Sequence, residues 1–146
     1  DYNNNYLDLL NQLYSLSDIS KEFYVKQLEN IKTRTNYYIR IIEEKSTGKI
    51  VATGSIYIEF KFAYNLGKVA YIDDIIVDKD YRNKGLGADL LRSILVDIKS
   101  KFGSGVLVYL NAQLEAITLY AHQGFLPIGP RFIEADIMHQ RMSQTT

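Results

Sequence analysis

VDKDYRNKGLGADLL, residues Val77–Leu91, joins an apolar segment to a helical pattern through a short turn of basic residues and glycines. Before it, residues 71–77 are mostly apolar and β-branched, which is typical of a buried strand. After it, apolar residues recur from Leu86 to Ile98 at intervals of three and four, which predicts a helix that continues to about Lys101. The stretch therefore predicts a strand, a basic turn and a helix that begins at the glycines.

This strand-turn-helix arrangement is suited to binding an anion. The first N–H groups of a helix lack backbone partners, and the aligned peptide dipoles place about half a positive charge there. Gly85 and Gly87 leave the backbone open to a phosphate, and Arg82 and Lys84 add charge. Neither the P-loop nor the dinucleotide fingerprint fits, because no Lys-Ser/Thr pair follows the glycines and position 90 is Leu. From these residues alone, an anion site and a turn with solvated basic side chains both stay open.

The remaining pattern predicts one α/β domain over residues 1–146, with a mixed central sheet flanked by helices. Helices are expected at about 6–15, 20–32, 86–101 and 113–122. Strands are expected at 37–44, 50–60, 68–77 and 106–110, and two closing strands within 125–129 and 132–142.

The composition excludes several classes of function. Basic and acidic residues both number 17, so no general field attracts nucleic acid, and no apolar run is long enough to span a membrane. The chain has no Cys, which excludes disulfides and a cysteine nucleophile and is compatible with a cytoplasmic location. No metal site is expected, because the chain has two His and the neighbouring Asp73 and Asp74 would point to opposite faces of a regular strand.

The glycine turn resembles the acetyl-CoA signature R/Q-x-x-G-x-G/A of the GNAT N-acetyltransferases, with Arg82, Gly85 and Gly87 at the signature positions. The resemblance implies that acetyl-CoA is the cosubstrate. Its pyrophosphate would be held around the backbone N–H groups of Asn83, Lys84, Gly85, Leu86, Gly87 and Ala88. Its pantetheine arm would pair with the backbone of Ile75, Ile76 and Val77.

The segments TGKIVATG (47–54) and YIDDIIVD (71–78) narrow the resemblance to glucosamine-6-phosphate N-acetyltransferases. This similarity covers about residues 6–91. It implies acetyl transfer to the amine of glucosamine 6-phosphate, a step toward UDP-N-acetylglucosamine, by a homodimer. The substrate contacts implied by the resemblance are Ser15, Lys61, Phe62, Ala63, Tyr64, Asp73, Asp74, Asn111 and Arg141.

The same resemblance implies catalytic roles for Asp74, Ile75 and Tyr120. The backbone N–H of Ile75 would polarise the thioester carbonyl, and the Tyr120 hydroxyl would protonate the departing thiolate. Water near Asp73 and Asp74 would accept the amine proton. Transfer would be direct, since no Cys or activated Ser is available as a nucleophile. Taken without the resemblance, the two aspartates also fit an edge strand, and Tyr120 also fits core packing.

Some positions depart from the sugar-enzyme pattern. Asn111 stands where the family has Asp, and an amide cannot take a proton. Residues 110–142 look more like another branch of acetyltransferases, and His139 within them has no assigned role. Two alternatives therefore stay open, namely acetylation of a different amine and a CoA-binding module without catalysis.

Overall fold

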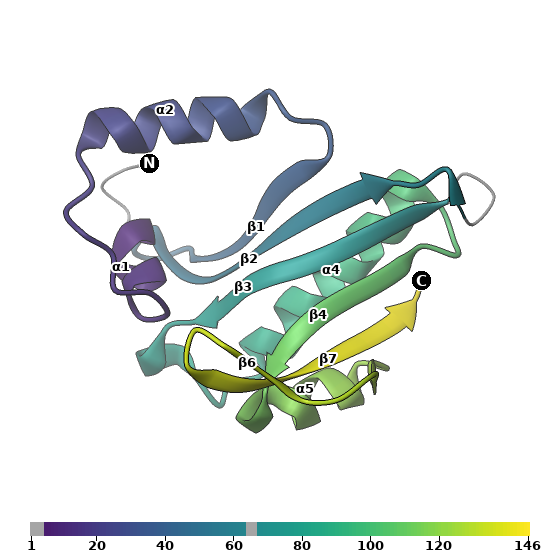
Figure 1. Cartoon of the computed structure of the whole chain (residues 1–146). Helices are drawn as coiled ribbons and strands as arrows, with labels where there is room; N and C mark the ends of the chain where they lie inside the picture. The colour runs from purple at the N-terminus through teal and green to yellow at the C-terminus, as the bar shows by residue number, and fades with distance from the viewer. Residues whose placement is uncertain (1–4, 64–66) are drawn as a thin grey trace.

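The protein, described by a computed structural model over residues 5–63 and 67–146, folds around one twisted sheet (Figure 1). Its elements in chain order are α1 (Tyr6–Asn11), α2 (Lys21–Lys32), β1 (Tyr37–Glu44), β2 (Lys49–Phe60), β3 (Lys68–Val77), η1 (Lys79–Tyr81), α4 (Leu86–Phe102), β4 (Leu107–Gln113), η2 (Leu114–Ala116), α5 (Ile117–His122), β5 (Leu126–Pro127), β6 (Phe132–Glu134) and β7 (Ile137–Thr145).

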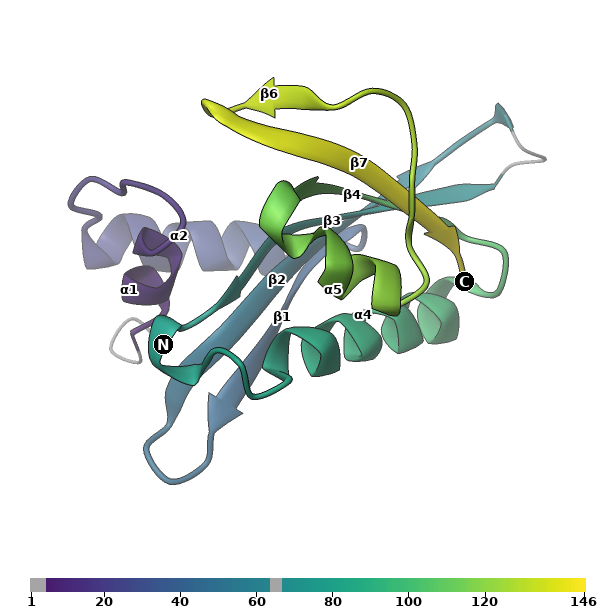
Figure 2. The ribbon, with the colours of Figure 1, turned by 90° about the horizontal axis from the view of Figure 1, so that it is seen from below.

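The sheet is mixed, as the sequence predicts. Among residues 5–63 and 67–146, its seven strands run in the order β1-β2-β3-β4-β7-β5, and β6 pairs with β7. Only β3 and β4 pair in parallel, because α4 carries the chain back to the starting edge between them. Figure 2 shows α4 and α5 together on one face of the sheet.

The main core lies between this face and α4. Leu90, Leu91, Ile94 and Ile98 are almost fully buried there, and they lie on one side of the helix because their spacing matches its turns. Burial of each such side chain contributes about 1.5–3 kcal/mol relative to exposure. On the other face, α1 inserts the fully buried Leu9 between β2 and β3 residues.

Four tyrosines form a row across the face opposite α4. Tyr37, Tyr57, Tyr71 and Tyr109 lie directly opposite one another on β1, β2, β3 and β4. The ring centroids of Tyr57 and Tyr71 are 6.2 Å apart, and those of Tyr71 and Tyr109 are 5.9 Å apart. We call this set the tyrosine row. It accounts for a third of the unusually high tyrosine content, 12 residues in all.

The structure differs from the predicted elements in three places. Strand β4 continues to Gln113, so the residues predicted to begin a helix there form the short η2 instead, and α5 starts at Ile117. Helix α1 ends at Asn11 instead of Ser15, because the Asn11 side chain accepts a hydrogen bond from the backbone of Leu16 (2.9 Å) and turns the chain. The second closing segment is a hairpin of two strands, β6 and β7, instead of one strand. Its turn holds Ala135 and Asp136 at φ 49° and 61°.

Candidate active site

The strands β3 and β4 separate halfway along the sheet. They pair only from Val69 and Leu107 to Tyr71 and Tyr109. Beyond these residues β4 stays with β7 and β3 stays with β2, so facing backbone groups are left for a ligand to pair with. A pocket lies at the separation, lined by Tyr71, Ile72, Asp73, Tyr109, Leu110, Asn111 and Arg141.

A β-bulge in β3 lies beside this separation. Ser55 is opposite Asp73 and Thr53 is opposite Ile76, so Gly54 alone faces Asp74 and Ile75. Asp74, which has a φ of 52°, is the extra residue of the bulge. A Cβ at position 54 would lie 2.6 Å from the Ile75 Cδ1 atom, so the glycine lets the bulge pack against β2. The regular alternation expected for Asp73 and Asp74 therefore does not hold here.

The Asp74 carboxylate accepts hydrogen bonds on both oxygens. Its Oδ1 accepts from the Tyr14 hydroxyl, and its Oδ2 accepts from the Ser55 hydroxyl at 3.2 Å. Burial and the Asp74 carboxylate raise the pKa of Tyr14 well above its ordinary value. The resemblance implied a substrate contact at Ser15, which is exposed in the segment that follows α1. The side chain that reaches Asp74 is that of its neighbour Tyr14. Only the high tyrosine content hinted at this residue.

Asp73 is exposed at the pocket, in contrast to the half-buried Asp74. Its Oδ1 accepts a hydrogen bond from the backbone N–H of Asp74 at 3.0 Å. Desolvation by the surrounding protein, followed by the negative charge of Asp74, raises the pKa of Asp73. Asp73 is therefore a carboxylate with a raised pKa that the pocket presents to a ligand.

Tyr120 lies on α5 with 7% of its surface exposed. Its ring packs edge-on against Phe125, with centroids 6.2 Å apart. Burial, and then the charge of Asp73, raises the pKa of Tyr120 to about 12. Its hydroxyl makes no hydrogen bond with residues 5–63 or 67–146. Tyr120 is thus a protonated phenol with a free donor.

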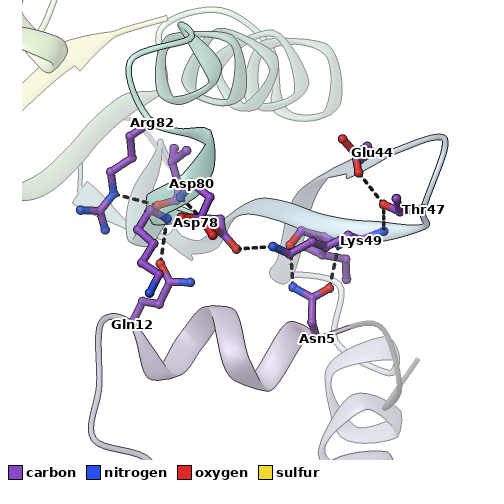
Figure 3. Close-up of polar contacts among 11 residues, drawn as sticks. Asn5, Gln12, Glu44, Thr47, Lys49, Asp78, Asp80 and Arg82 are labelled. Carbon is purple, nitrogen blue, oxygen red and sulfur yellow. Dashed lines mark hydrogen bonds and ion pairs between the residues drawn. The ribbon is translucent and has the colours of Figure 1, made fainter.

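The turn before α4 is fixed by the buried Asp78 (Figure 3). The Asp78 carboxylate accepts from the backbone N–H of Asp80 at 2.9 Å and pairs with Lys49 Nζ at 3.0 Å. The Gln12 side chain, just past α1, accepts from the backbone N–H of Lys79 at 2.9 Å. In Figure 3 these contacts join three segments that are distant in sequence, so the turn has a defined shape before any ligand binds.

The N-terminus of α4 is open in the way that an anion requires. Gly85 precedes the helix with a φ of 81°, and no side chain caps the first N–H groups. A Cβ on Gly87 would lie 3.3 Å from Leu119 Cδ2, so a glycine at this position lets the start of α4 lie close to α5. Arg82 Nε donates to the Val77 carbonyl at 3.1 Å, and Lys84 Nζ lies 4.9 Å from the centre of the Tyr81 ring. These residues fit a pyrophosphate at the helix and an extended arm along Ile75–Val77.

The opposite wall of the pocket comes from β4 and β7, where Asn111 and Arg141 are register partners. Arg141 Nε donates to Asn111 Oδ1 at 3.2 Å, and Asn111 Nδ2 donates to Glu134 Oε1 at 3.4 Å. The structure therefore places Asp73, Asn111 and Arg141 around one pocket. Glu134 is a neighbour to which the sequence assigned no role.

The loop after β2 lies elsewhere. Lys61, Phe62 and Ala63 precede the start of β3, and Asp73 is five residues along that strand, roughly 16 Å away. Phe62 is 96% exposed, and Lys61 pairs with Glu59. Tyr64 lies outside the described residues. Within one chain, these predicted substrate contacts are separated from the pocket, because they follow the end of β2, beside the start of β3 (Figure 1).

Two features are not found in residues 5–63 and 67–146. No helix there is apolar enough over a sufficient length to cross a membrane. No three His, Asp or Glu side chains there are grouped so that they could hold a metal ion.

Comparison with known proteins shows consistent similarities. A family model described as "Acetyltransferase (GNAT) family" matches residues 4–125. A glucosamine 6-phosphate N-acetyltransferase of Arabidopsis thaliana is 36% identical over 101 residues, which cover 68% of each chain. One of Candida albicans is 34% identical over 94 residues, which cover 64% of this chain and 63% of the relative. The crystal structure of the glucosamine-6-phosphate N-acetyltransferase from Arabidopsis thaliana superposes with a TM-score of 0.83 at 30% identity, covering 91% of this chain and 90% of that one. A Trypanosoma brucei acetyltransferase superposes with a TM-score of 0.77 at 25% identity, covering 88% of each chain.

Proposed function

This chain belongs to the GNAT acetyltransferase family, and from that premise we propose that it transfers an acetyl group from acetyl-CoA to the amine of glucosamine 6-phosphate. The product would be N-acetylglucosamine 6-phosphate. The observation that carries the proposal is the pocket between β3 and β4, which holds Asp73 for an amine and Arg141 for a phosphate. The similarity to glucosamine 6-phosphate N-acetyltransferases supports the same substrate.

The cosubstrate would be bound by the chain's open backbone groups. The N–H groups at residues 83–88 bind a pyrophosphate at the start of α4, because the helix end is uncapped. The edge of Ile75–Val77 that does not pair with β4 binds the extended arm. Bound acetyl-CoA supplies an activated thioester, whose carbonyl would lie near the bulge.

The acceptor would be bound by side chains of both walls. Asp73 orients the amine, since it is the exposed carboxylate of the bulge. Arg141, held by Asn111, offers the positive charge that a phosphomonoester needs, because the net charge of the chain is zero. The backbone N–H of Ile75 polarises the carbonyl under attack, and Tyr120 donates its proton to the thiolate.

The protein would act as a homodimer in this proposal. Lys61–Ala63 lie far from the pocket of their own chain, and the exposed Phe62 is available for contact with another subunit. A second copy would bring this loop to the acceptor and complete the site.

A CoA-release assay across a panel of amines tests the proposal. We expect glucosamine 6-phosphate to be acetylated with a higher kcat/KM than glucosamine, a polyamine or a peptide N-terminus. A preference for one of the latter would favour the alternative of a different amine, which the sequence of residues 110–142 left open. Binding of acetyl-CoA without turnover of any amine would favour a CoA-binding module.

A further inference from the structure

His139 and Glu134 form a pair beside the pocket that has no role in the steps above. His139 lies on β7 and is 7% exposed, and its ring stacks on Phe132 of β6 with centroids 5.9 Å apart. Its Nε2 is 3.9 Å from Glu134 Oε2. The Glu134 side chain is 54% exposed, so the pair runs from the protein interior to an open carboxylate.

The hydrogen bonds of His139 fix which nitrogen carries the proton. Its Nδ1 is 2.8 Å from the carbonyl oxygen of Ile137. A carbonyl oxygen only accepts, so Nδ1 must donate. A neutral imidazole has one N–H, which leaves Nε2 with a lone pair that faces the Glu134 carboxylate. A proton that arrives at Nε2 would turn two opposed acceptors into an ion pair.

The pair is connected to the acceptor side of the pocket. Glu134 Oε1 accepts from Asn111, which lines the pocket. The negative charge of Glu134 and the positive charge that His139 carries when protonated act on Asp73 in opposite directions, and Glu134 also acts on Tyr14. The charged or titratable groups around the ring are therefore Glu134, Asp73, Tyr14 and, two residues along β7, Arg141.

The other side chains of the site are occupied or lack a basic lone pair. Asp73 orients the amine in the proposal above, and one of its oxygens already accepts from the backbone N–H of Asp74 at 3.0 Å. Both Asp74 oxygens already accept hydrogen bonds, and Tyr120 is protonated. Asn111 and Arg141 have no basic lone pair. Imidazole is the side chain whose charge changes most readily between pH 5 and 8.

We infer that Glu134 binds the acceptor ammonium together with Asp73 and that His139 takes its proton. The inference rests on the proposed amine acetylation and goes beyond it. The ammonium passes one proton through the Glu134 carboxylate to His139 Nε2, and the freed lone pair forms a C–N bond with the thioester carbon. When the C–S bond breaks, its electron pair goes to sulfur, which takes the Tyr120 proton. The second amine proton restores Tyr120, and His139 releases its proton to solvent, so one proton is released per amide formed.

The test compares His139→Gln and Glu134→Gln with a control, His122→Gln, which removes the only other histidine, exposed at the end of α5. The readouts are kcat/KM for glucosamine 6-phosphate from pH 6 to 9.5 and the Kd of acetyl-CoA. We expect His139→Gln to lower kcat/KM about a hundredfold near pH 6.5, since this is within the usual range for a general base. Activity should recover as pH rises and the free amine becomes abundant. Glu134→Gln should mainly raise KM for the amine, while the control and the Kd stay unchanged.

A loss in His139→Gln that is the same at every pH would show a structural role and overturn the inference. The imidazole ¹⁵N shifts of the wild-type protein give a second readout that does not depend on activity, assigned by comparison with His122→Gln. We expect the Nδ1–H form for His139, and an Nε2–H form would also overturn the inference. If the wild-type enzyme prefers another amine, the substrate proposal fails, and the same pH series with that amine still decides the role of His139.

Discussion

The Tyr120→Phe substitution separates catalysis from packing at the centre of the site. It removes the hydroxyl and keeps the buried ring against Phe125. The pKa of Tyr120 is raised to about 12, so the hydroxyl is protonated at every pH at which the enzyme is assayed. A raised pKa makes the phenol a weaker acid, but it keeps the O–H available to donate to the departing thiolate as negative charge develops on sulfur. We therefore expect kcat to fall when the hydroxyl is removed.

The size of the loss follows from the leaving group. A positioned acid contributes about 10²–10⁴-fold, but a thiolate departs more readily than an alkoxide or an amide nitrogen. We expect a loss at or below the lower limit of that range, about ten- to a hundredfold in kcat, or about 1.4–2.7 kcal/mol. Because the Tyr120 pKa is so high, the wild-type rate should also show no decline from phenol ionisation below about pH 10.

The chain offers a matched control in Tyr38→Phe. The Tyr38 hydroxyl is buried without a partner in the described residues, and burial raises its pKa to about 12 as well. However, Tyr38 packs against the α4 core, away from the pocket. Steady-state kinetics with saturating acetyl-CoA, and urea denaturation of each variant, should show a lower kcat for Tyr120→Phe alone. Equal kcat values for wild type and Tyr120→Phe would assign Tyr120 to packing and refute the proposed acid.

Three further predictions concern the loop, the phosphate and the buried carboxylate. A Cβ at position 87 would lie 3.3 Å from Leu119, and the two further carbons of Val would crowd the start of α4. Gly87→Val should therefore lower acetyl-CoA affinity at least about tenfold in an equilibrium titration, and unchanged affinity would place the anion site elsewhere. Arg141→Ala should raise KM for glucosamine 6-phosphate about ten- to a hundredfold, as expected for a charge-assisted contact, and an equal KM would exclude Arg141 as the phosphate ligand. Desolvation tends to raise the pKa of Asp78, but hydrogen bonds from Asp80 and Lys49 outweigh it and the pKa is lowered. Asp78 therefore stabilises the fold above its unfolded pKa of about 3.9, and this contribution is lost as pH falls through the lower folded pKa. Urea midpoints should thus depend less on pH in this acid range for Asp78→Asn than for wild type, and parallel curves would contradict the role.

The sequence predicted the central strands and α4 well because their patterns are strong and local. The spacing from Leu86 to Ile98 corresponds to one buried helix face, and residues 68–77 form a strand as expected. The β6–β7 hairpin was missed because its turn residues, Ala135 and Asp136, are not the Asn-Gly type that usually marks two positive φ values.

The site was harder to predict because it depends on tertiary contacts. The bulge at Asp74 has no sequence signature, since it arises from the pairing of β3 with Gly54 on β2. Tyr14 reaches Asp74 across 60 residues of sequence, and Glu134 meets Asn111 only because β7 pairs with β4. Such contacts between distant segments leave no periodic pattern along the chain.

The tyrosine row gives the protein a built-in optical reporter. The chain has no Trp, so its ultraviolet emission comes from tyrosine alone. Tyr71 and Tyr109 line the pocket, and Tyr57 stacks on Tyr71, so a molecule entering between β3 and β4 changes the surroundings of these coupled chromophores. Ligand binding can therefore be followed by intrinsic fluorescence without a dye or a label, and Tyr109→Phe would identify the share of the signal that originates at the pocket.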